Sequence, residues 1–155
     1  MKRVQHAQRR RGLVAVQVGV AMTVIVGFAA LTIDVGVMYN AKADLQRTAD
    51  AAALAAASKL ADFTNSSKTP VELARDEAIV YTERNFVFGQ ANAQMTLDPA
   101  DVEFGRAVYN DVTGSYDFVP TTNFPDSVRV RVRMDDQSSN RALSLYFARI
   151  FGKDK

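Results

Sequence analysis

The stretch Gly12–Ile33, GLVAVQVGVAMTVIVGFAALTI, contains 22 residues and no charged side chain. At about 1.5 Å per residue, a helix of this length spans roughly 33 Å, which matches a bilayer hydrocarbon core of about 30 Å. A backbone in lipid must satisfy its own hydrogen bonds, so the stretch predicts a helix. We therefore interpret residues 12–33 as a transmembrane helix.

The residues before this stretch set its orientation. Residues 1–11 carry five basic side chains and no acidic one: Lys2, Arg3, Arg9, Arg10 and Arg11. Positive charges before a first apolar helix keep that end in the cytoplasm. We therefore expect a single-pass protein with a cytoplasmic tail over residues 1–11 and an extracytoplasmic remainder. The competing interpretation is a signal peptide cleaved near Ala29 or Ala30. A retained anchor is favoured because the apolar core of a signal peptide is usually only about 7–15 residues long.

The charge balance argues against nucleic acid as a partner. The chain of 155 residues has a net charge of +2, but without the five basic residues of the tail it holds 14 basic and 17 acidic residues. The excess of positive charge is therefore a topology signal and not a nucleic-acid footprint. Cysteine is absent, so disulfides, thiol catalysis and thiolate metal sites are excluded.

A helical extension is expected after the apolar stretch. Ten alanines occur between Ala41 and Ala61, and no proline interrupts the sequence before Pro70. Alanine is the strongest helix former. The sequence therefore predicts one helix from Leu13 to about Asp62, in which residues 34–62 form an Ala-rich extension beyond the membrane.

Residues 63–155 predict a small extracytoplasmic α+β domain. Thr69 and Pro70 are typical of a helix N-cap and first turn, and the domain is expected to contain a second helix, a small antiparallel sheet of about three strands and a short C-terminal helix. The expected ranges are 70–86 for the helix, 102–109, 115–119 and 127–134 for the strands, and 141–151 for the last helix. In the third strand the alternation places Val128, Val130, Val132 and Met134 in the core and Arg129, Arg131 and Arg133 in water.

The sequence contains no recognisable catalytic constellation. The single histidine is His6, in the tail, so histidine-based catalysis beyond the membrane is excluded. The pair Asp135-Asp136 has too few ligands for calcium and is interpreted as a solvated strand end. We therefore expect no enzyme activity, catalytic residue, cofactor, metal or small-molecule substrate.

Four small residues of the apolar stretch recur at intervals of four: Ala15, Gly19, Thr23 and Gly27. Small side chains on one face let a second helix approach closely in a membrane. The alternative is that membrane helices simply contain many small residues, and the sequence leaves both interpretations open.

A resemblance to a known family rests on the segment Ile33–Ala57, IDVGVMYNAKADLQRTADAAALAAA, preceded by RRRGLVAV. It resembles the TadG-like, or TadE/G-like, proteins of the Tad (Flp, tight adherence) pilus apparatus over about residues 9–62. The residues that carry the resemblance are Gly12, Asp34, Gly36, Tyr39, Leu45, Gln46, Asp50 and Leu54, with Ala49, Ala51–Ala53 and Ala55–Ala57.

The resemblance implies a bacterial inner-membrane protein with a periplasmic domain. It implies a minor pilin-like or assembly component of a Tad/Flp-type pilus, which binds other pilus proteins through its N-terminal helix and serves cell adhesion. Longer relatives carry an adhesion domain with a DxSxS metal-binding pattern, which is missing here. The alternative is a membrane-tethered module that binds another envelope component and is unrelated to pili.

Peptidase processing at Gly12 is a further question. Type IV pilin precursors, a broader family, are cut after such a glycine and carry an acid at the fifth position of the new chain. Here Leu13 would become the first residue, and Gln17 stands where the acid is expected. Because TadG-like members remain uncut, we expect an intact N-terminus.

Overall fold

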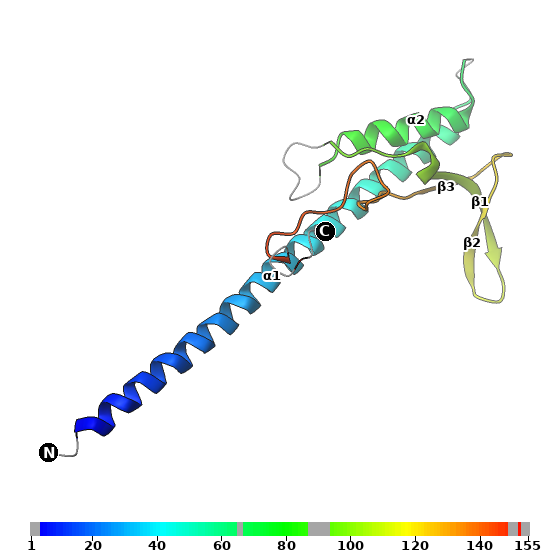
Figure 1. Cartoon of the computed structure of the whole chain (residues 1–155). Helices are drawn as coiled ribbons and strands as arrows, with labels where there is room; N and C mark the ends of the chain where they lie inside the picture. Colours follow the sequence, from blue (N-terminus) through cyan, green and yellow to red (C-terminus); the bar gives the residue numbers. More distant parts are fainter. Residues whose placement is uncertain (1–3, 65–66, 87–93, 149–151, 153–155) are drawn as a thin grey trace. The chain divides into compact units, whose positions relative to one another are not determined.

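The computed structural model describes residues 4–64, 67–86, 94–148 and 152 of the chain (Figure 1). The elements, in chain order, are α1 (Val4–Leu60), α2 (Pro70–Glu83), the 3-10 helix η1 (Pro99–Asp101), β1 (Val102–Asn110), β2 (Ser115–Pro120) and β3 (Ser127–Val130). The predicted α+β class, with a long N-terminal helix, a second helix and a three-stranded antiparallel sheet, is confirmed. The chain divides into two compact units, one of residues 1–37 with 145–155 and the other of residues 38–144.

Helix α1 begins earlier than the sequence predicted and ends close to the predicted point. It has 57 residues and runs without a break from Val4 to Leu60. Just after the helix, the N–H of Asp62 donates to the carbonyl of Lys59 at 3.1 Å, and the Asp62 carboxylate accepts from the N–H of Thr64. This side-chain hydrogen bond offers the backbone an alternative to a further helical turn.

Helix α2 begins with a complete capping box. The Thr69 hydroxyl accepts from the N–H of Glu72 at 3.3 Å, and the Glu72 carboxylate accepts from the N–H of Thr69 at 2.8 Å. Pro70 occupies the first helical turn, as predicted. These hydrogen bonds from Thr69 hold the pKa of Glu72 below its ordinary value of 4.5. The helix ends at Glu83, three residues before the predicted end.

The sheet has the strand order β2-β1-β3, with both pairings antiparallel. β3 ends at Val130 and not at Met134, because its partner β1 begins at Val102, directly opposite Val130. Just beyond this pairing, the N–H of Arg131, which follows β3, donates to the carbonyl of Asp101, which precedes β1, at 3.0 Å.

The predicted alternation in residues 127–134 is correct on its apolar side, since Val128, Val130, Val132 and Met134 all pack against buried clusters. Arg133 differs from the prediction because it is half-buried. Its Nε and Nη2 atoms donate to the carboxylate of Asp101 at 3.0 and 2.8 Å. These hydrogen bonds raise the pKa of Arg133 above its ordinary value.

The core of the 38–144 unit joins both helices to the sheet. Its buried members are Ala52, Ala56, Ala74, Ala78, Leu97, Val102 and Phe104. The four alanines, two from each helix, are fully buried. Helix α2 therefore contributes its two small residues Ala74 and Ala78 to this core. Each alanine buries little area, so larger residues such as Phe104 supply most of the apolar burial.

The predicted helix over residues 141–151 is not found in its described part. Residues 141–147 are irregular, Arg141 has a left-handed φ of 57°, and residues 149–151 lie outside the described part of the chain. Long-range hydrogen bonds hold this region instead. The Asn140 amide accepts from the N–H of Thr96 at 2.7 Å and donates to the carbonyls of Thr96 and Arg133. Such contacts override the helical period of the sequence.

Candidate functional site: surfaces of the long helix

The apolar part of helix α1 exposes its side chains all round. From Leu13 to Ile33 each residue is exposed except Ala30, which is half-buried. The exposed fractions of Leu13, Val26 and Phe28 are 65–66%. Among the described residues, one helix is long and apolar enough to cross a membrane, and it contains this stretch. A contiguous apolar surface of this size marks a membrane or protein interaction site.

The four small residues lie within this exposed stretch. A Cβ atom added to Gly19 or to Gly27 would meet no atom within 4 Å. The Thr23 hydroxyl donates to the carbonyl of Gly19 at 3.0 Å, so it is satisfied within its own helix. The surface around these residues is therefore open to a neighbouring helix or to lipid.

The predicted processing residues lie on the same helix. Gly12 belongs to α1, and the side chains of Leu13 and Gln17 are exposed. Their placement neither favours nor opposes cleavage.

Asp34 has a defined structural role within the unit of residues 1–37 and 145–155. Its side chain accepts from three consecutive backbone N–H groups. The N–H of Tyr146 lies 2.9 Å from Oδ1, the N–H of Phe147 lies 3.2 Å from Oδ1 and 3.1 Å from Oδ2, and the N–H of Ala148 lies 2.7 Å from Oδ2. We call this contact the Asp34 clasp. Three donors on one carboxylate compensate for its burial, since Asp34 is only 5% exposed.

The remaining residues of the resemblance divide between two faces of α1. On the inner face, Leu45 packs against the buried cluster of Ala41 and Met95, and Ala49 and Ala53 are half-buried. The outer face carries exposed residues: Tyr39, Gln46, Asp50 and Leu54. Gly36 is half-buried.

The outer-face residues form an unusual mixture. Leu54 is 75% exposed and Tyr39 is 71% exposed. Between them, the Gln46 amide donates to the Asp50 carboxylate at 2.8 Å, four residues on. At 100° per residue, Tyr39, Gln46 and Asp50 lie on one stripe of the helix. The side chains of this stripe are exposed, and Gln46 and Asp50 also border a groove toward residues 130–132, so the stripe is available to a partner.

A groove of about 330 Å³ lies between α1 and the end of the sheet. One wall comes from α1 and the other from Val130, Arg131 and Val132. The α1 residues that line the groove are Lys42, Leu45, Gln46, Ala49, Asp50 and Ala53. Five of these six residues belong to the resemblance.

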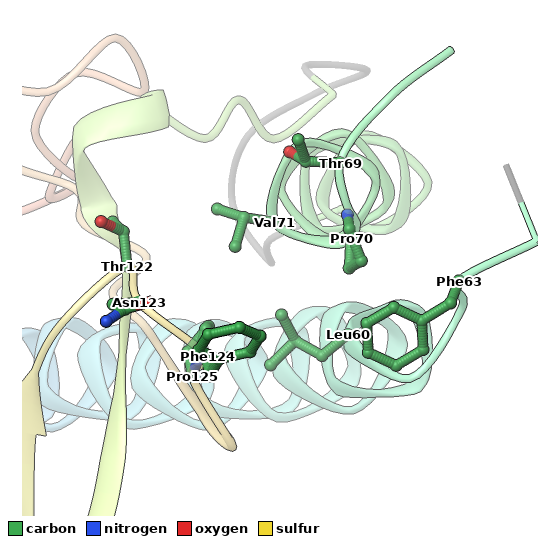
Figure 2. Close-up of a pocket in the computed structure, with 9 residues that line it drawn as sticks. All are labelled: Leu60, Phe63, Thr69, Pro70, Val71, Thr122, Asn123, Phe124 and Pro125. Carbon is green, nitrogen blue, oxygen red and sulfur yellow. The ribbon is translucent and has the colours of Figure 1, made fainter. Parts of the chain in front are cut away.

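A second cavity, of about 370 Å³, lies where α1 ends and α2 begins (Figure 2). Its walls are mainly apolar: Leu60, Phe63, Pro70, Val71, Phe124 and Pro125, with Thr69, Thr122 and Asn123 as polar members. Phe124 is 80% exposed and has a left-handed φ of 49°, a conformation that costs about 1–3 kcal/mol in a non-glycine residue. Figure 2 shows the side chain of Leu60 between the rings of Phe124 and Phe63.

Comparison with known families confirms the resemblance. Residues 12–59 match the family model described as putative Flp pilus-assembly TadE/G-like. Over these residues the chain is therefore similar to the TadE/G-like proteins of Flp pilus assembly. Searches of curated proteins and of solved structures found no match. The matched region ends one residue before α1 does, so the comparison concerns the long helix.

The description of the matched family concerns pilus assembly and names no enzymatic activity. Among residues 4–64, 67–86, 94–148 and 152, no group of three or more His, Cys, Asp or Glu side chains is placed to hold a metal ion.

Sequence reasoning identified Asp34 as a residue of the resemblance but missed its role. One signal was available, since Asp34 is the first charged residue after the apolar stretch. Its donors lie more than 110 positions away, beyond the reach of any local pattern. The cavity at Phe63 and Phe124 was also missed, because it joins two loops distant in the sequence.

Proposed function

We propose that this protein is a single-pass component of the bacterial inner membrane that takes part in assembling a Tad/Flp-type pilus. In this proposal residues 1–11 are the cytoplasmic tail and residues 12–33 the transmembrane helix. Residues 34–62 form the Ala-rich extension, and residues 63–155 form the periplasmic domain. The observation that carries the proposal is that the family match, residues 12–59, begins with the uncharged stretch of α1, whose residues 13–33 are exposed except for Ala30.

Three features support membrane residence. The apolar stretch has the length of a bilayer core, its side chains are exposed, and five basic residues precede it. In water, these exposed side chains would cost about 25 cal/mol for each Å² of apolar surface, which a soluble protein avoids by burying them.

The protein's role is helix packing and presentation of the periplasmic domain. Two surfaces of α1 suit other pilus proteins: the small residues Ala15, Gly19, Thr23 and Gly27 within the membrane, and the Tyr39–Leu54 outer face beyond it. Close approach at small residues favours helix association in lipid. Exposed apolar and polar side chains at helical spacing suit helix-to-helix docking outside it.

An intact basic tail would place the protein at the base of the filament and not along its shaft. Each of the five charges would cost about 2.5–3.5 kcal/mol at the centre of the bilayer, so extraction of an uncut chain is strongly opposed. Cleavage after Gly12 would remove all five charges and turn the protein into a pilin-like subunit.

The test combines fractionation with mass spectrometry of the purified protein. We expect the protein in the alkaline-carbonate-resistant membrane fraction, with a mass that includes residues 1–12. A soluble protein would contradict the anchor. A first residue at Leu13 would contradict the role at the filament base and support a pilin role.

The alternative function, an envelope-binding module unrelated to pili, is favoured by the cavity that Phe63 and Phe124 border. Deletion of the gene separates the two functions. Loss of surface pili supports the assembly role, whereas normal pili with loss of another envelope property supports the binding module. A Phe124→Ser variant tests whether the cavity is needed, with the exposed residue Val112→Ser as the matched control.

A further inference from the structure

The Asp34 clasp fixes a second, non-helical segment at the end of the apolar stretch. Asp34 follows Ile33 directly, and the N–H groups of Tyr146, Phe147 and Ala148 lie 2.7–3.2 Å from its carboxylate oxygens. All of these residues belong to one compact unit of the chain. The position of residues 146–148 relative to the apolar helix is therefore defined within a single unit.

The depth of the clasp follows from helix geometry. If the hydrocarbon layer ends near Ile33, the polar headgroup layer occupies roughly the next 5–7 Å. One residue adds about 1.5 Å, so about the first four residues after Ile33 fall within that layer. Helical side chains lean toward the N-terminus, which draws the Asp34 carboxylate back toward the hydrocarbon. The backbone of residues 146–148 then lies at headgroup depth.

The side chains at this depth suit the interface. Tyr146 is 62% exposed, and Leu145 and Phe147 are half-buried. Leu31 and Ile33, 60% and 50% exposed, continue the apolar surface toward them. Tyrosine prefers the headgroup layer because its ring is apolar and its hydroxyl is polar. The charge of Asp34 is tolerated there because backbone N–H groups satisfy it.

We propose that the segment Leu145–Ala148 is a membrane-contacting element. Its partner is the headgroup layer of the periplasmic leaflet, and Asp34 is the positioning residue that holds the segment against it. This inference rests on the proposed membrane span of residues 12–33. The segment gives the protein a second contact with the bilayer, about 110 residues after the first. It holds both chain segments of this unit, residues 1–37 and 145–155, at the same membrane surface.

Tryptophan fluorescence in vesicles tests the proposal, because the chain contains no tryptophan. Full-length variants, each with one tryptophan, are placed in phosphatidylcholine–phosphatidylglycerol vesicles. These contain lipid brominated either near the glycerol backbone or near the methyl end of the acyl chain. The reporter is Tyr146→Trp. The matched controls are Phe28→Trp, within the apolar stretch, and Tyr116→Trp, 71% exposed on β2.

We expect Tyr146→Trp to show blue-shifted emission that the shallow bromines quench more than the deep ones. Phe28→Trp should be quenched most by the deep bromines and Tyr116→Trp by neither. Emission from Tyr146→Trp that neither lipid quenches, with Phe28→Trp still quenched, overturns the inference and leaves the span intact. Unquenched Phe28→Trp overturns the span and the inference together.

Asp34→Ala, combined with Tyr146→Trp, tests the positioning role. We expect the shallow quenching to fall to the level of Tyr116→Trp, while Phe28→Trp in the same background keeps its deep quenching. Asp34→Asn, which retains one acceptor oxygen, should give an intermediate loss. Quenching of Tyr146→Trp that is unchanged in both variants overturns the role assigned to Asp34.

Discussion

Ala56 and Ala57 are neighbours on helix α1 that should respond oppositely to the same substitution. Ala56 is fully buried in the cluster that contains Ala74 and Ala78 of α2, whereas Ala57 is exposed. Ala56→Leu forces extra carbons into the contact between two alanine faces. Overpacking of this kind costs about 1–3 kcal/mol. Ala57→Leu adds the same atoms to the surface, where changes are usually within about 0.5 kcal/mol.

The effect is large against the stability of a small domain. A unit of about one hundred residues has a free energy of unfolding of about 5–15 kcal/mol. Each kcal/mol lowers its midpoint temperature by about 4–8 °C. We therefore expect Ala56→Leu to lower the midpoint by roughly 4–24 °C and Ala57→Leu to leave it nearly unchanged.

Near-ultraviolet circular dichroism of the full chain in detergent measures this midpoint. All five tyrosines lie after the apolar stretch, so their signal reports on the folded part and not on the detergent-bound helix. Equal midpoints for Ala56→Leu and Ala57→Leu would refute the intramolecular packing of the Ala-rich extension. A larger loss for Ala57→Leu would mean that the opposite face is the packed one.

Three further predictions follow from other parts of the chain. Gly105→Ala should destabilise the protein by about 1–3 kcal/mol in urea titrations, because an added Cβ would lie 2.6 Å from the Phe118 ring and the Val119 carbonyl oxygen; Gly36→Ala, which meets no atom, is the control and should not destabilise it. Hydrogen bonds from Thr69 lower the pKa of Glu72, so their stabilising effect is present above pH 4.5 and is lost as the pH falls through the folded-state pKa; the urea midpoint of the wild type should fall below pH 4.5 more steeply than that of Glu72→Gln. Changing Gly19 and Gly27 together to Leu should keep the protein in the membrane but reduce co-purification of pilus partners. The control, Val18→Leu with Val26→Leu, should leave co-purification unchanged. Equal co-purification in both double variants would show that the small residues have no interaction role.

The long helix, the second helix and the sheet could be predicted because their signals are local. Alanine content and the absence of proline predict α1, and Thr69-Pro70 predicts the start of α2. The alternation from Val128 to Met134 predicts which valines face the core. These features depend on neighbouring residues and on the spacing of apolar side chains, and both can be read from the sequence.

Features that depend on distant partners could not be predicted. The length of β3 is set by where β1 begins, and the half-buried position of Arg133 is set by Asp101. The amphipathic spacing of residues 141–151 resembles a helix. However, the side chain of Asn140, just before them, is hydrogen-bonded to the backbone of Thr96 and Arg133, and Asp34 accepts from the N–H groups of residues 146–148. For the candidate site, the sequence indicated the residues of the long helix but not their division between an inner face, an outer face and the Asp34 clasp.

The central claim is that residues 12–33 span the inner membrane with the N-terminus in the cytoplasm. Cysteine labelling tests it most directly, because the chain has no cysteine and each variant then carries a single thiol. In intact spheroplasts treated with a membrane-impermeant maleimide, we expect Val112→Cys, on a residue that is 95% exposed, to be labelled and Lys2→Cys to be protected. Detergent should make both thiols reactive. Replacing Arg9, Arg10 and Arg11 with Glu should weaken this pattern, because orientation depends on positive charge beside the span. Labelling of Lys2→Cys in intact spheroplasts, with protection of Val112→Cys, would contradict the account.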